Sequence, residues 1–179
     1  MNINISNLDT NFEKWASIDG YLNYQVSWWG RVLNTKTGRI LKNTFGSHGY
    51  LHVSLSKNGK VKTHCIHAMV AQAWVLNPEG KKCVDHIDGN KTNNHLENLR
   101  YATFSENSQN QTKTSKPTSS IYKGVDYNKR AGMWRARIRT PGKRIELGFF
   151  TSEREAAKIY NAAAVLHHTN FAKLNKIED

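Results

Sequence analysis

The sequence predicts an α+β protein of three successive blocks, because strand patterns and helix patterns occur in separate runs along the chain. Residues 12–60 carry strand-like runs separated by glycine turns. Residues 83–110 follow the order strand, loop, strand, helix. Residues 121–175 read as three strands and one helix, which predicts a three-stranded antiparallel sheet packed on that helix.

The composition favours a polyanionic partner. The chain has 179 residues and a formal net charge of +12 at pH 7, so its average field attracts nucleic acid. This length allows one or two small domains, each with a modest core. No apolar run reaches membrane-spanning length and the N-terminus has no signal pattern, so we expect a soluble, intracellular protein with no membrane partner.

The two cysteines are too few for a disulfide scaffold, and Cys65 and Cys83 form no CxxC pair. We interpret them as thiols in a reducing compartment. A zinc site made of these cysteines with His64 and His67 is an alternative, although the spacing of the four residues is irregular.

The first block contains short strands and is followed by one helix. Residues 49–55 alternate apolar and polar side chains, and Asn58-Gly59 follows as a hairpin turn. Apolar residues then recur at helical spacing over Ile66–Val75, with His67 expected to pack or hydrogen-bond beside an active site. The cations expected to contact phosphate are Arg31, Arg39, Lys42 and Lys57.

Residues 83–110 carry the chemistry. An adjacent acid and base, Asp85 and His86, lie on a short strand-like run. A capping-box pattern over residues 103–106 predicts the start of a helix with Asn107 in its first turn. A carboxylate and an amide oxygen are hard ligands suited to Mg²⁺, and a neutral imidazole can take a proton from water. Such groups can hydrolyse a phosphodiester.

This segment resembles the HNH nucleases, and most closely the homing endonucleases found in phage group I introns. The matching residues are Asp85–Asn90, Asn93, Asn94, Glu97–Arg100, Glu106 and Asn107. The resemblance implies a ββα-metal unit over residues 61–111 with one divalent ion, Mg²⁺ or Mn²⁺. Asp85 and Asn107 would bind the metal. His86 would be the general base, and Asn98 would brace the active-site loop and keep His86 in orientation.

Residues 1–60 resemble the small module that precedes the nuclease in homing endonucleases and accompanies DNA binding there. The matching residues are Trp15, Gly20, Tyr21, Val26, Ser27, Gly30–Val32, Gly49 and Tyr50. For the aromatic residues Trp15, Tyr21 and Tyr50 we favour packing in a core, so the DNA contacts of the module are expected from its cations.

A polar run separates the nuclease segment from the third block, and we expect a linker over residues 112–119. In the strand-like run 133–139, the period of two places Arg135, Arg137 and Arg139 on one face. Without interleaved acids these arginines would repel one another unless they bind an anion. The expected inner face of the following helix is Ala156, Ala157, Ile159, Tyr160, Ala163, Ala164 and Leu166.

Residues 120–175 resemble the DNA-binding domain of plant ethylene-response factors, the APETALA type, so we expect such a domain over residues 120–179. The matches are Tyr122–Val125, Gly132–Trp134, Ala136–Arg139, Leu147–Phe150, Glu155–Ala157, Tyr160, Ala163, Ala164 and Asn170–Asn175. The implied DNA contacts are Lys123, Asn128, Arg137, Arg139 and Arg144, to which the arginine face adds Arg135. Asp126 and Glu146 depart from the plant pattern, so the plant target sequence is not expected here.

Together the resemblances predict a homing-type endonuclease that acts on double-stranded DNA as a strand-nicking monomer, without an obligatory protein partner. Tethering the hydrolytic unit to a separate DNA reader raises its affinity through effective concentration. We expect a phage or viral protein that acts in the cytoplasm of the host cell. The alternative is a DNA-binding regulator whose nuclease fold has lost activity. RNA binding has less support, since stacking aromatics are not evident among the arginines.

Overall fold

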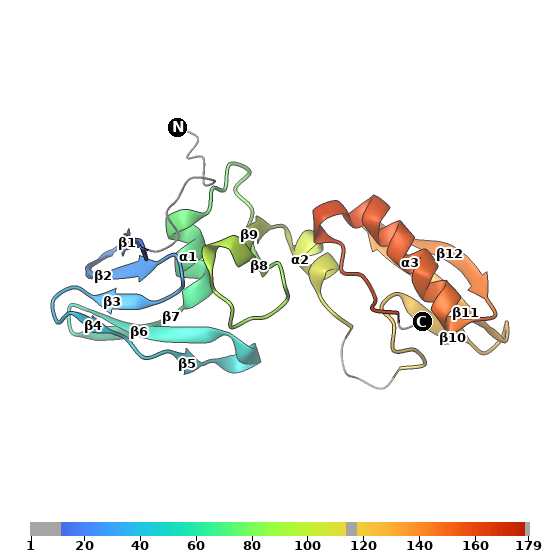
Figure 1. Cartoon of the computed structure of the whole chain (residues 1–179), viewed down its shortest axis with the longest axis horizontal. Helices are drawn as coiled ribbons and strands as arrows, with labels where there is room; N and C mark the ends of the chain where they lie inside the picture. The colour runs from blue at the N-terminus through green and yellow to red at the C-terminus, as the bar shows by residue number, and fades with distance from the viewer. Residues whose placement is uncertain (1–11, 114–117, 178–179) are drawn as a thin grey trace. The chain divides into compact units, whose positions relative to one another are not determined.

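The computed structural model describes residues 12–113 and 118–177, which pack as two compact units (Figure 1). Unit 1 spans Met1–Tyr101 and unit 2 spans Ala102–Asp179. The predicted boundary between residues 60 and 61 therefore lies inside unit 1. Residues 114–117 of the predicted linker lie outside the described residues.

Unit 1 holds the strand-rich part of the chain. Its antiparallel sheets have the strand orders β1-β2-β3-β4 and β5-β6-β7. The strands are β1 (Trp15–Ile18), β2 (Tyr21–Ser27), β3 (Val32–Asn34), β4 (Arg39–Ile40), β5 (Thr44–Phe45), β6 (Leu51–Lys57) and β7 (Lys60–Cys65). A 3₁₀ turn, η2 (Ser47–Gly49), joins β5 to β6. The predicted turn Asn58-Gly59 joins β6 to β7 with both residues at positive φ.

Unit 1 also holds the first elements of the predicted nuclease segment. The helix α1 (Ile66–Trp74) follows β7 where the apolar spacing predicts it. The strands β8 (Cys83–His86) and β9 (Leu99–Ala102) form a two-stranded sheet, and the 3₁₀ turn η3 (Leu96–Asn98) leads into β9. The predicted order of strand, loop and strand is therefore present, and β9 ends at the border of the two units.

One hydrophobic core joins the four-stranded and the three-stranded sheets of unit 1 with α1 and β9. Its buried members are Tyr24, Val26, Val32, Val53, Leu55, Ile66, Met69, Val70 and Leu99. Full burial of a Val or Leu side chain contributes about 1.5–3 kcal/mol relative to an exposed one. Since Leu99 of β9 lies in the same cluster as Val26 of β2, the N-terminal strands and the nuclease strands fold as one body.

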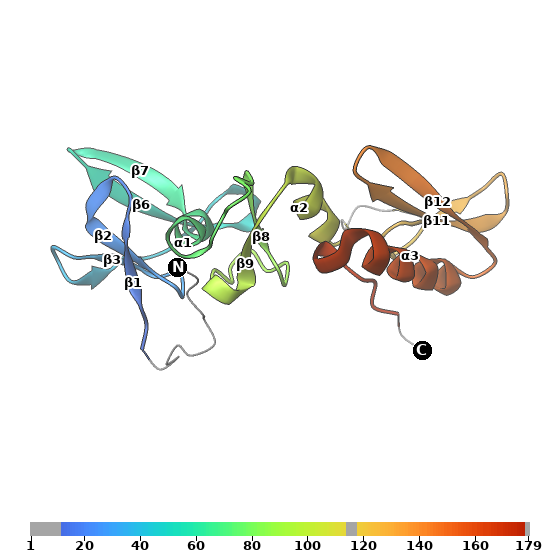
Figure 2. The same cartoon turned by 90° about the horizontal axis from the view of Figure 1, so that it is seen from above.

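Unit 2 consists of a short helix and a sheet–helix domain. Its elements are α2 (Phe104–Asn110), β10 (Val125–Asn128), β11 (Met133–Thr140), β12 (Lys143–Phe150), α3 (Glu153–His168) and the 3₁₀ turn η4 (Thr169–Phe171). The strands form an antiparallel sheet in the order β10-β11-β12, and α3 lies along one face of it (Figure 2). The predicted three-stranded sheet packed on one helix is thus confirmed.

Small side chains bring α3 close to this sheet. Its buried residues are Ala156, Ala157, Tyr160, Ala164 and His168. Two residues predicted for this face, Ile159 and Leu166, are 39% and 73% exposed, because the helical period places them on the opposite side of α3. Gly124 has a φ of +77°, and a Cβ atom on it would lie 2.0 Å from Tyr160 Cδ2, so no side chain fits between the strand and α3.

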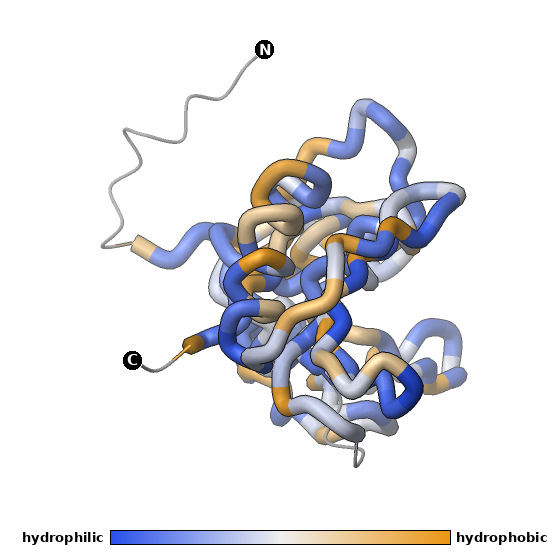
Figure 3. Tube along the Cα trace, turned by 90° about the vertical axis from the view of Figure 1, so that its right-hand side faces the viewer, coloured by the Kyte–Doolittle hydropathy of each residue, from blue (hydrophilic) through white to orange (hydrophobic). Residues whose placement is uncertain are grey.

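Apolar stretches along the chain are short. Figure 3 shows them alternating with hydrophilic stretches along the trace. The longest described helix, α3, has 16 residues, fewer than the roughly 20 that span a bilayer. No helix of the described residues is long and apolar enough to cross a membrane.

Candidate active site

The adjacent residues Asp85 and His86 end β8 and are nearly fully buried, with exposed fractions of 4% and 5%. The pairing of β8 with β9 continues past them, where the Ile87 amide donates to the Asn98 carbonyl at 2.9 Å. Buried polar side chains need hydrogen-bond partners, since burial without them costs free energy. The partners of this pair therefore define the site.

Arg100 provides the counter-charge for Asp85. Its Nε and Nη2 atoms both lie 2.8 Å from Asp85 Oδ2. Charge-assisted hydrogen bonds of this kind are stronger than neutral ones. Arg100 lies on β9, so strand pairing places its guanidinium beside the carboxylate, a role that its position in the sequence does not reveal.

Asn94 holds the ring of His86. Asn94 Oδ1 lies 3.0 Å from His86 Nε2, and Asn94 is itself only 4% exposed. Gly30, at a φ of +81°, lies against this asparagine, and a Cβ atom on Gly30 would approach Asn94 Cβ to 2.8 Å. The Leu96 amide also donates to the Trp28 carbonyl at 2.7 Å. The turn between β2 and β3 therefore supports the loop that holds His86.

A network of side chains closes the loop between β8 and η3. Asp88 Oδ1 accepts from the Asn90 amide at 2.6 Å and from Asn98 Nδ2 at 2.9 Å. Asp88 Oδ2 accepts from Asn93 Nδ2 at 2.8 Å, and Asn98 Oδ1 accepts from the Asp88 amide at 3.0 Å. Burial acts to raise the pKa of Asp88, but the hydrogen bonds from Asn93, Asn90 and Asn98 outweigh it and lower that pKa. Asn98 thus lies at the centre of the loop's own hydrogen bonds.

Two further rings pack beside His86. The ring centroids of His67 and His86 are 5.1 Å apart, and those of Tyr50 and His67 are 4.8 Å apart. The Nδ1 atom of His67 is buried without a hydrogen-bond partner. Burial, followed by the neighbouring His86 and His52, lowers the pKa of His67 to about 4, so this ring is neutral at pH 7. His67 therefore packs beside the site as an uncharged ring.

The depressed pKa of His67 predicts that unit 1 loses stability in acid. The ordinary value is 6.5, so between pH 6.5 and about pH 4 the unfolded chain binds more protons than the folded one. Stability is complete above this window and falls as the pH is lowered through it, by about 1–3 kcal/mol after solvent screening. Urea unfolding followed by tryptophan fluorescence at pH 5 and pH 7 measures the fall. The His67→Phe variant should show a smaller fall, and an equal fall would contradict this assignment.

The alternative zinc site is not assembled. His64 Nε2 lies 2.8 Å from the Tyr21 hydroxyl, and Cys65 Sγ lies 3.0 Å from His52 Nε2. Within residues 12–113 and 118–177, no group of three or more His, Cys, Asp or Glu side chains is arranged to hold a metal ion. A metal ion at Asp85 would therefore take water, amide or substrate oxygens as its other ligands.

Asn107 lies in the first turn of α2, in unit 2. The predicted capping box starts this helix: Thr103 Oγ1 accepts from the Glu106 amide at 3.2 Å, and Glu106 Oε2 accepts from the Thr103 amide at 2.7 Å. The Asn107 amide donates to the Thr103 carbonyl at 3.0 Å. The start of the helix is thus confirmed, whereas a shared metal ion at Asp85 and Asn107 stays a prediction.

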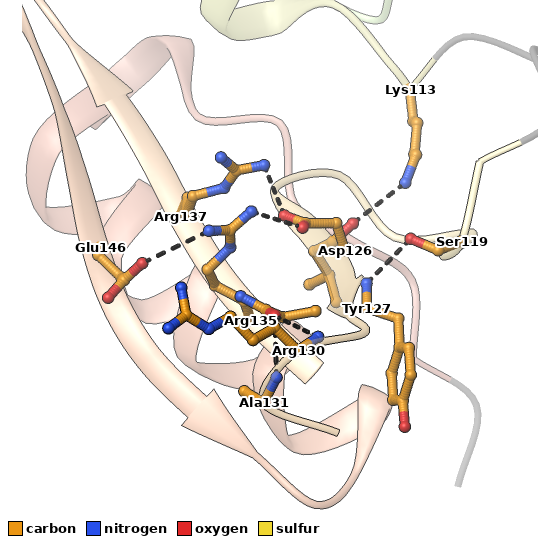
Figure 4. A network of polar contacts seen from close by, with 11 residues as sticks. Lys113, Ser119, Asp126, Tyr127, Arg130, Ala131, Arg135, Arg137 and Glu146 are labelled. Carbon is orange, nitrogen blue, oxygen red and sulfur yellow. Dashed lines mark hydrogen bonds and ion pairs between the residues drawn. The ribbon is translucent and has the colours of Figure 1, made fainter. Parts of the chain in front are cut away.

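The arginine face of the C-terminal sheet contains an acid that the period of two does not reveal. Asp126 of β10 lies directly opposite Arg135 of β11. Its Oδ2 accepts from Arg135 Nη2 at 2.9 Å, and its Oδ1 accepts from Arg137 Nη2 at 2.6 Å (Figure 4). Glu146 of β12 lies 3.8 Å from Arg135. The expectation of same-face arginines without interleaved acids is therefore wrong for Arg135 and Arg137, because the neighbouring strands insert carboxylates.

The other residues predicted to contact DNA through this domain have different surroundings. Arg139 and Arg144 lie opposite each other on β11 and β12, and both are exposed. Asn128 Oδ1 accepts from two amides of the following turn, each at 3.0 Å, and so shapes that turn. Lys123 is half-buried, with its ammonium on main-chain carbonyls. Of these four residues, only Arg139 and Arg144 have exposed side chains.

The cations of unit 1 differ in the same way. Arg31 forms an ion pair with Glu13, and its guanidinium lies 5.9 Å from the ring centroid of Trp15. The Arg31 guanidinium therefore already has partners within the protein. The remaining predicted phosphate contacts, Arg39, Lys42 and Lys57, are exposed.

Comparisons with known protein families match two stretches of the chain. Residues 13–56 match the NUMOD4 motif, and residues 77–109 match the HNH endonuclease model, a stretch that contains Asp85, His86, Asn98 and Asn107. The DNA endonuclease I-HmuI of Bacillus phage SP01 is 42% identical over 99 residues, which cover 55% of this chain and 57% of that protein. Protein 3.8 of Escherichia phage T7 is 39% identical over 84 residues, which cover 47% of this chain and 69% of that protein.

A solved structure agrees with these matches. The structure described as "DNA binding and cleavage by the HNH homing endonuclease I-HmuI" superposes with a TM-score of 0.51 at 43% identity, over 55% of this chain and 57% of that one. The chain spans between 27% and 57% of the length of most curated relatives that it matches. The APETALA resemblance of residues 120–175 stays a prediction. The stretch that matches the HNH endonuclease model contains Asp85 and His86 at the end of β8, and the match to Protein 3.8 covers 69% of that phage protein. The chain therefore belongs to the HNH endonuclease family.

Proposed function

We propose that the chain is a metal-dependent endonuclease of the homing type that nicks one strand of double-stranded DNA. The observation that carries this proposal is the buried pair Asp85–His86, with the acid held by Arg100 and the imidazole held by Asn94. The relative I-HmuI, described as a homing endonuclease that binds and cleaves DNA, supports the substrate class. A net charge of +12 suits the same polyanion.

Asp85 and Asn107 are the residues that would hold the metal ion. One carboxylate and one amide oxygen fit Mg²⁺ or Mn²⁺, because such ions take hard oxygen ligands and complete their shells with water and substrate oxygens. The Arg100 contact orients the Asp85 carboxylate independently of any ion. When bound, the ion acts as a Lewis acid on the phosphodiester oxygens.

His86 is the proposed general base. Asn94 Oδ1 accepts only, so the His86 ring donates from Nε2 and the neutral ring carries its lone pair on Nδ1. Nδ1 takes a proton from water while the water oxygen bonds to phosphorus. The bond from phosphorus to the 3′ oxygen breaks, and that oxygen is protonated from solvent. The products carry a 5′ phosphate and a 3′ hydroxyl.

Asn98 acts on this step as a positioning residue. Its hydrogen bonds run to Asp88 and to the Asn93 carbonyl, both in the loop that connects His86 to Asn94. A fixed loop keeps Asn94 at hydrogen-bond distance from the imidazole. Small displacements of a reacting group lower the rate steeply, so this bracing contributes to catalysis without contact with the substrate.

The C-terminal sheet is the proposed second DNA contact, in the manner that the APETALA resemblance implies. Arg139 and Arg144 face each other on exposed strand positions, and like charges in such a pair repel unless an anion lies between them. Arg135 and Arg137 already share Asp126, so they would contact DNA only with this carboxylate beside them. We therefore expect Arg139 and Arg144 to contribute most to binding.

Replacing Arg139 and Arg144 together with alanine should weaken DNA binding by about tenfold and lower the slope of log Kd against log salt by about 2. Fluorescence anisotropy with labelled duplex DNA at several salt concentrations measures both quantities. The double variant Arg154→Ala with Lys158→Ala removes the same charge from exposed positions on α3. An equal loss in that control would assign the effect to net charge and not to the sheet.

A plasmid-nicking assay tests the proposed function. Supercoiled plasmid that carries genomic fragments of the source is incubated with the protein at low salt, with Mg²⁺, Mn²⁺ or a chelator. Open circles that form with either metal and not with the chelator are expected. Binding without cleavage under every metal condition would reject the endonuclease and favour the DNA-binding regulator.

A further inference from the structure

Lys123 is placed by the rigid part of the C-terminal domain. Its amide donates to Asn175 Oδ1 at 2.7 Å, and its carbonyl accepts from Asn175 Nδ2 at 3.0 Å. Asn161 of α3 fixes Asn175 in turn, through contacts of 2.8 Å to its amide and 2.9 Å to its carbonyl. The next residue, Gly124, packs against Tyr160. The main chain at Lys123 therefore shifts only together with the sheet and α3.

The side chain of Lys123 ends at α2. Its Nζ donates to the Gln109 carbonyl at 2.5 Å and to the Gln111 carbonyl at 2.6 Å. The last carbonyls of a helix lack partners within the helix and carry the negative end of its dipole, so an ammonium there satisfies and stabilises them. Lys113 makes the reverse contact, since its Nζ donates to the Tyr122 carbonyl at 2.8 Å. Two lysines thus connect the end of α2 with the start of β10.

We propose that Lys123 is a positioning residue that fastens α2 to the sheet–helix domain, so that the helix carrying Asn107 and the DNA-reading face move as one body. This inference rests on the proposed function, because the position of Asn107 matters for catalysis if it binds the metal. The helix α2 has 7 residues, too few for stability on its own, since isolated helices shorter than about 12 residues are marginal in water. Gln109 and Asn110 are only 9% and 5% exposed. The helix therefore depends on its docking.

A cleft beside this contact supports a shared path for DNA. Its volume is about 880 Å³, and α2 borders it together with the sheet. The residues that matter here are Ser105 and Ser108 of α2 and Arg137, Arg139 and Arg144 of the sheet. A DNA backbone that reaches these arginines would therefore also pass α2. Movement of α2 relative to the sheet would misalign the DNA.

The surroundings of Lys123 also favour a link within the protein over a contact with a DNA groove. Burial, followed by the charge of Lys173, lowers the pKa of Lys123 to about 8. Two carbonyls hold the ammonium on the side facing α2. A lysine that contacts phosphate is usually exposed and solvated, whereas the ammonium of Lys123 is hydrogen-bonded to main-chain carbonyls. For Lys123 we therefore propose the link to α2 in place of the DNA contact that the APETALA resemblance implies.

Matched variants of the full chain test the inference. Lys123→Met keeps the aliphatic stem and removes the donors, Lys123→Arg keeps a cation with donors, and Lys129→Met changes an exposed lysine in the next turn. With Mg²⁺ and saturating protein, Lys123→Met should lower the single-turnover nicking rate by about tenfold. Its Kd for DNA and its salt slope should match those of the wild type. Lys123→Arg should restore most of the rate, and Lys129→Met should leave it unchanged.

Amide hydrogen exchange over residues 104–111 gives a readout that does not depend on cleavage. Lys123→Met should accelerate this exchange by about tenfold, and Lys129→Met should not. A weaker Kd with a salt slope lower by about 1 and unchanged exchange would overturn the inference and identify Lys123 as a DNA contact. If the wild type nicks DNA under no condition, the proposed function fails. Exchange then still decides whether Lys123 fastens α2, because unchanged exchange overturns that link.

Discussion

Replacing His86 with alanine should lower metal-dependent nicking by about 10²–10⁴-fold while leaving DNA affinity nearly unchanged. A positioned general base contributes a factor of this size. The ring is buried, and its Nε2 is held by Asn94, so no second imidazole can take its place without moving the loop. His67 is the nearest alternative, but its pKa of about 4 makes it a weak base.

Single-turnover nicking at saturating protein separates the loss of chemistry from a loss of binding. His86→Asn serves as a second variant, since alanine leaves a cavity in a buried site. His95→Ala is the matched control, because His95 lies in the same segment and its Nδ1 accepts from the Glu97 amide instead of facing the site. Normal nicking by both His86 variants would reject the general-base assignment. Loss of DNA binding or of folding in both would show that His86 holds the structure.

Local signals predicted the elements that carry the site. The capping box at Thr103 and Glu106 marks the start of α2, and the apolar spacing from Ile66 marks α1. These signals succeed because caps and helical periods depend on residues that are close in the sequence. The alternation in β11 likewise places Ala136 and Ile138 in the core. The HNH motif adds Asp85 and His86 at their observed place on β8.

Contacts between distant segments could not be predicted in the same way. Gly30, between β2 and β3, packs against Asn94, between β8 and η3. In the sequence this glycine looks like an ordinary turn residue. Asp126 lies between Arg135 and Arg137 only because antiparallel pairing sets β10 against β11 in one register. A period of two assigns faces within one strand and says nothing of what the next strand inserts.

The burial of a charged residue shows the same limit. The sequence assigns Lys123 to DNA by position in a family pattern, whereas its ammonium reaches the carbonyls at the end of α2. Whether a lysine stem lies in solvent or folds back on the protein depends on the neighbouring chain, not on local pattern. Lysines and arginines that look alike in a basic sequence therefore divide into exposed side chains, such as Arg139, and internal links, such as Lys123.

The Asn94→Leu variant should reduce nicking by about 10–100-fold, with DNA affinity unchanged, because outer partners that orient a functional histidine contribute this much. Leucine has nearly the shape of asparagine but accepts no hydrogen bond, so His86 Nε2 loses its acceptor. The imidazole can then rotate or take the other tautomer, with its proton on the nitrogen that should receive one. Asn94→Asp keeps an acceptor at the same place and should retain more activity than leucine.

The order of activity, wild type above Asn94→Asp and Asn94→Asp above Asn94→Leu, distinguishes orientation of the base from packing of the loop. Asn94 is 4% exposed and lies against Gly30, so any substitution there disturbs packing to some degree. A purely structural role would rank the variants by stability, and a buried carboxylate should destabilise the fold more than leucine does. The nicking rates of the two variants therefore follow opposite orders under the two explanations. Urea unfolding of both variants gives the order of stability against which the nicking rates are compared. If the leucine variant is both the more stable and the more active, Asn94 supports the loop and does not orient His86.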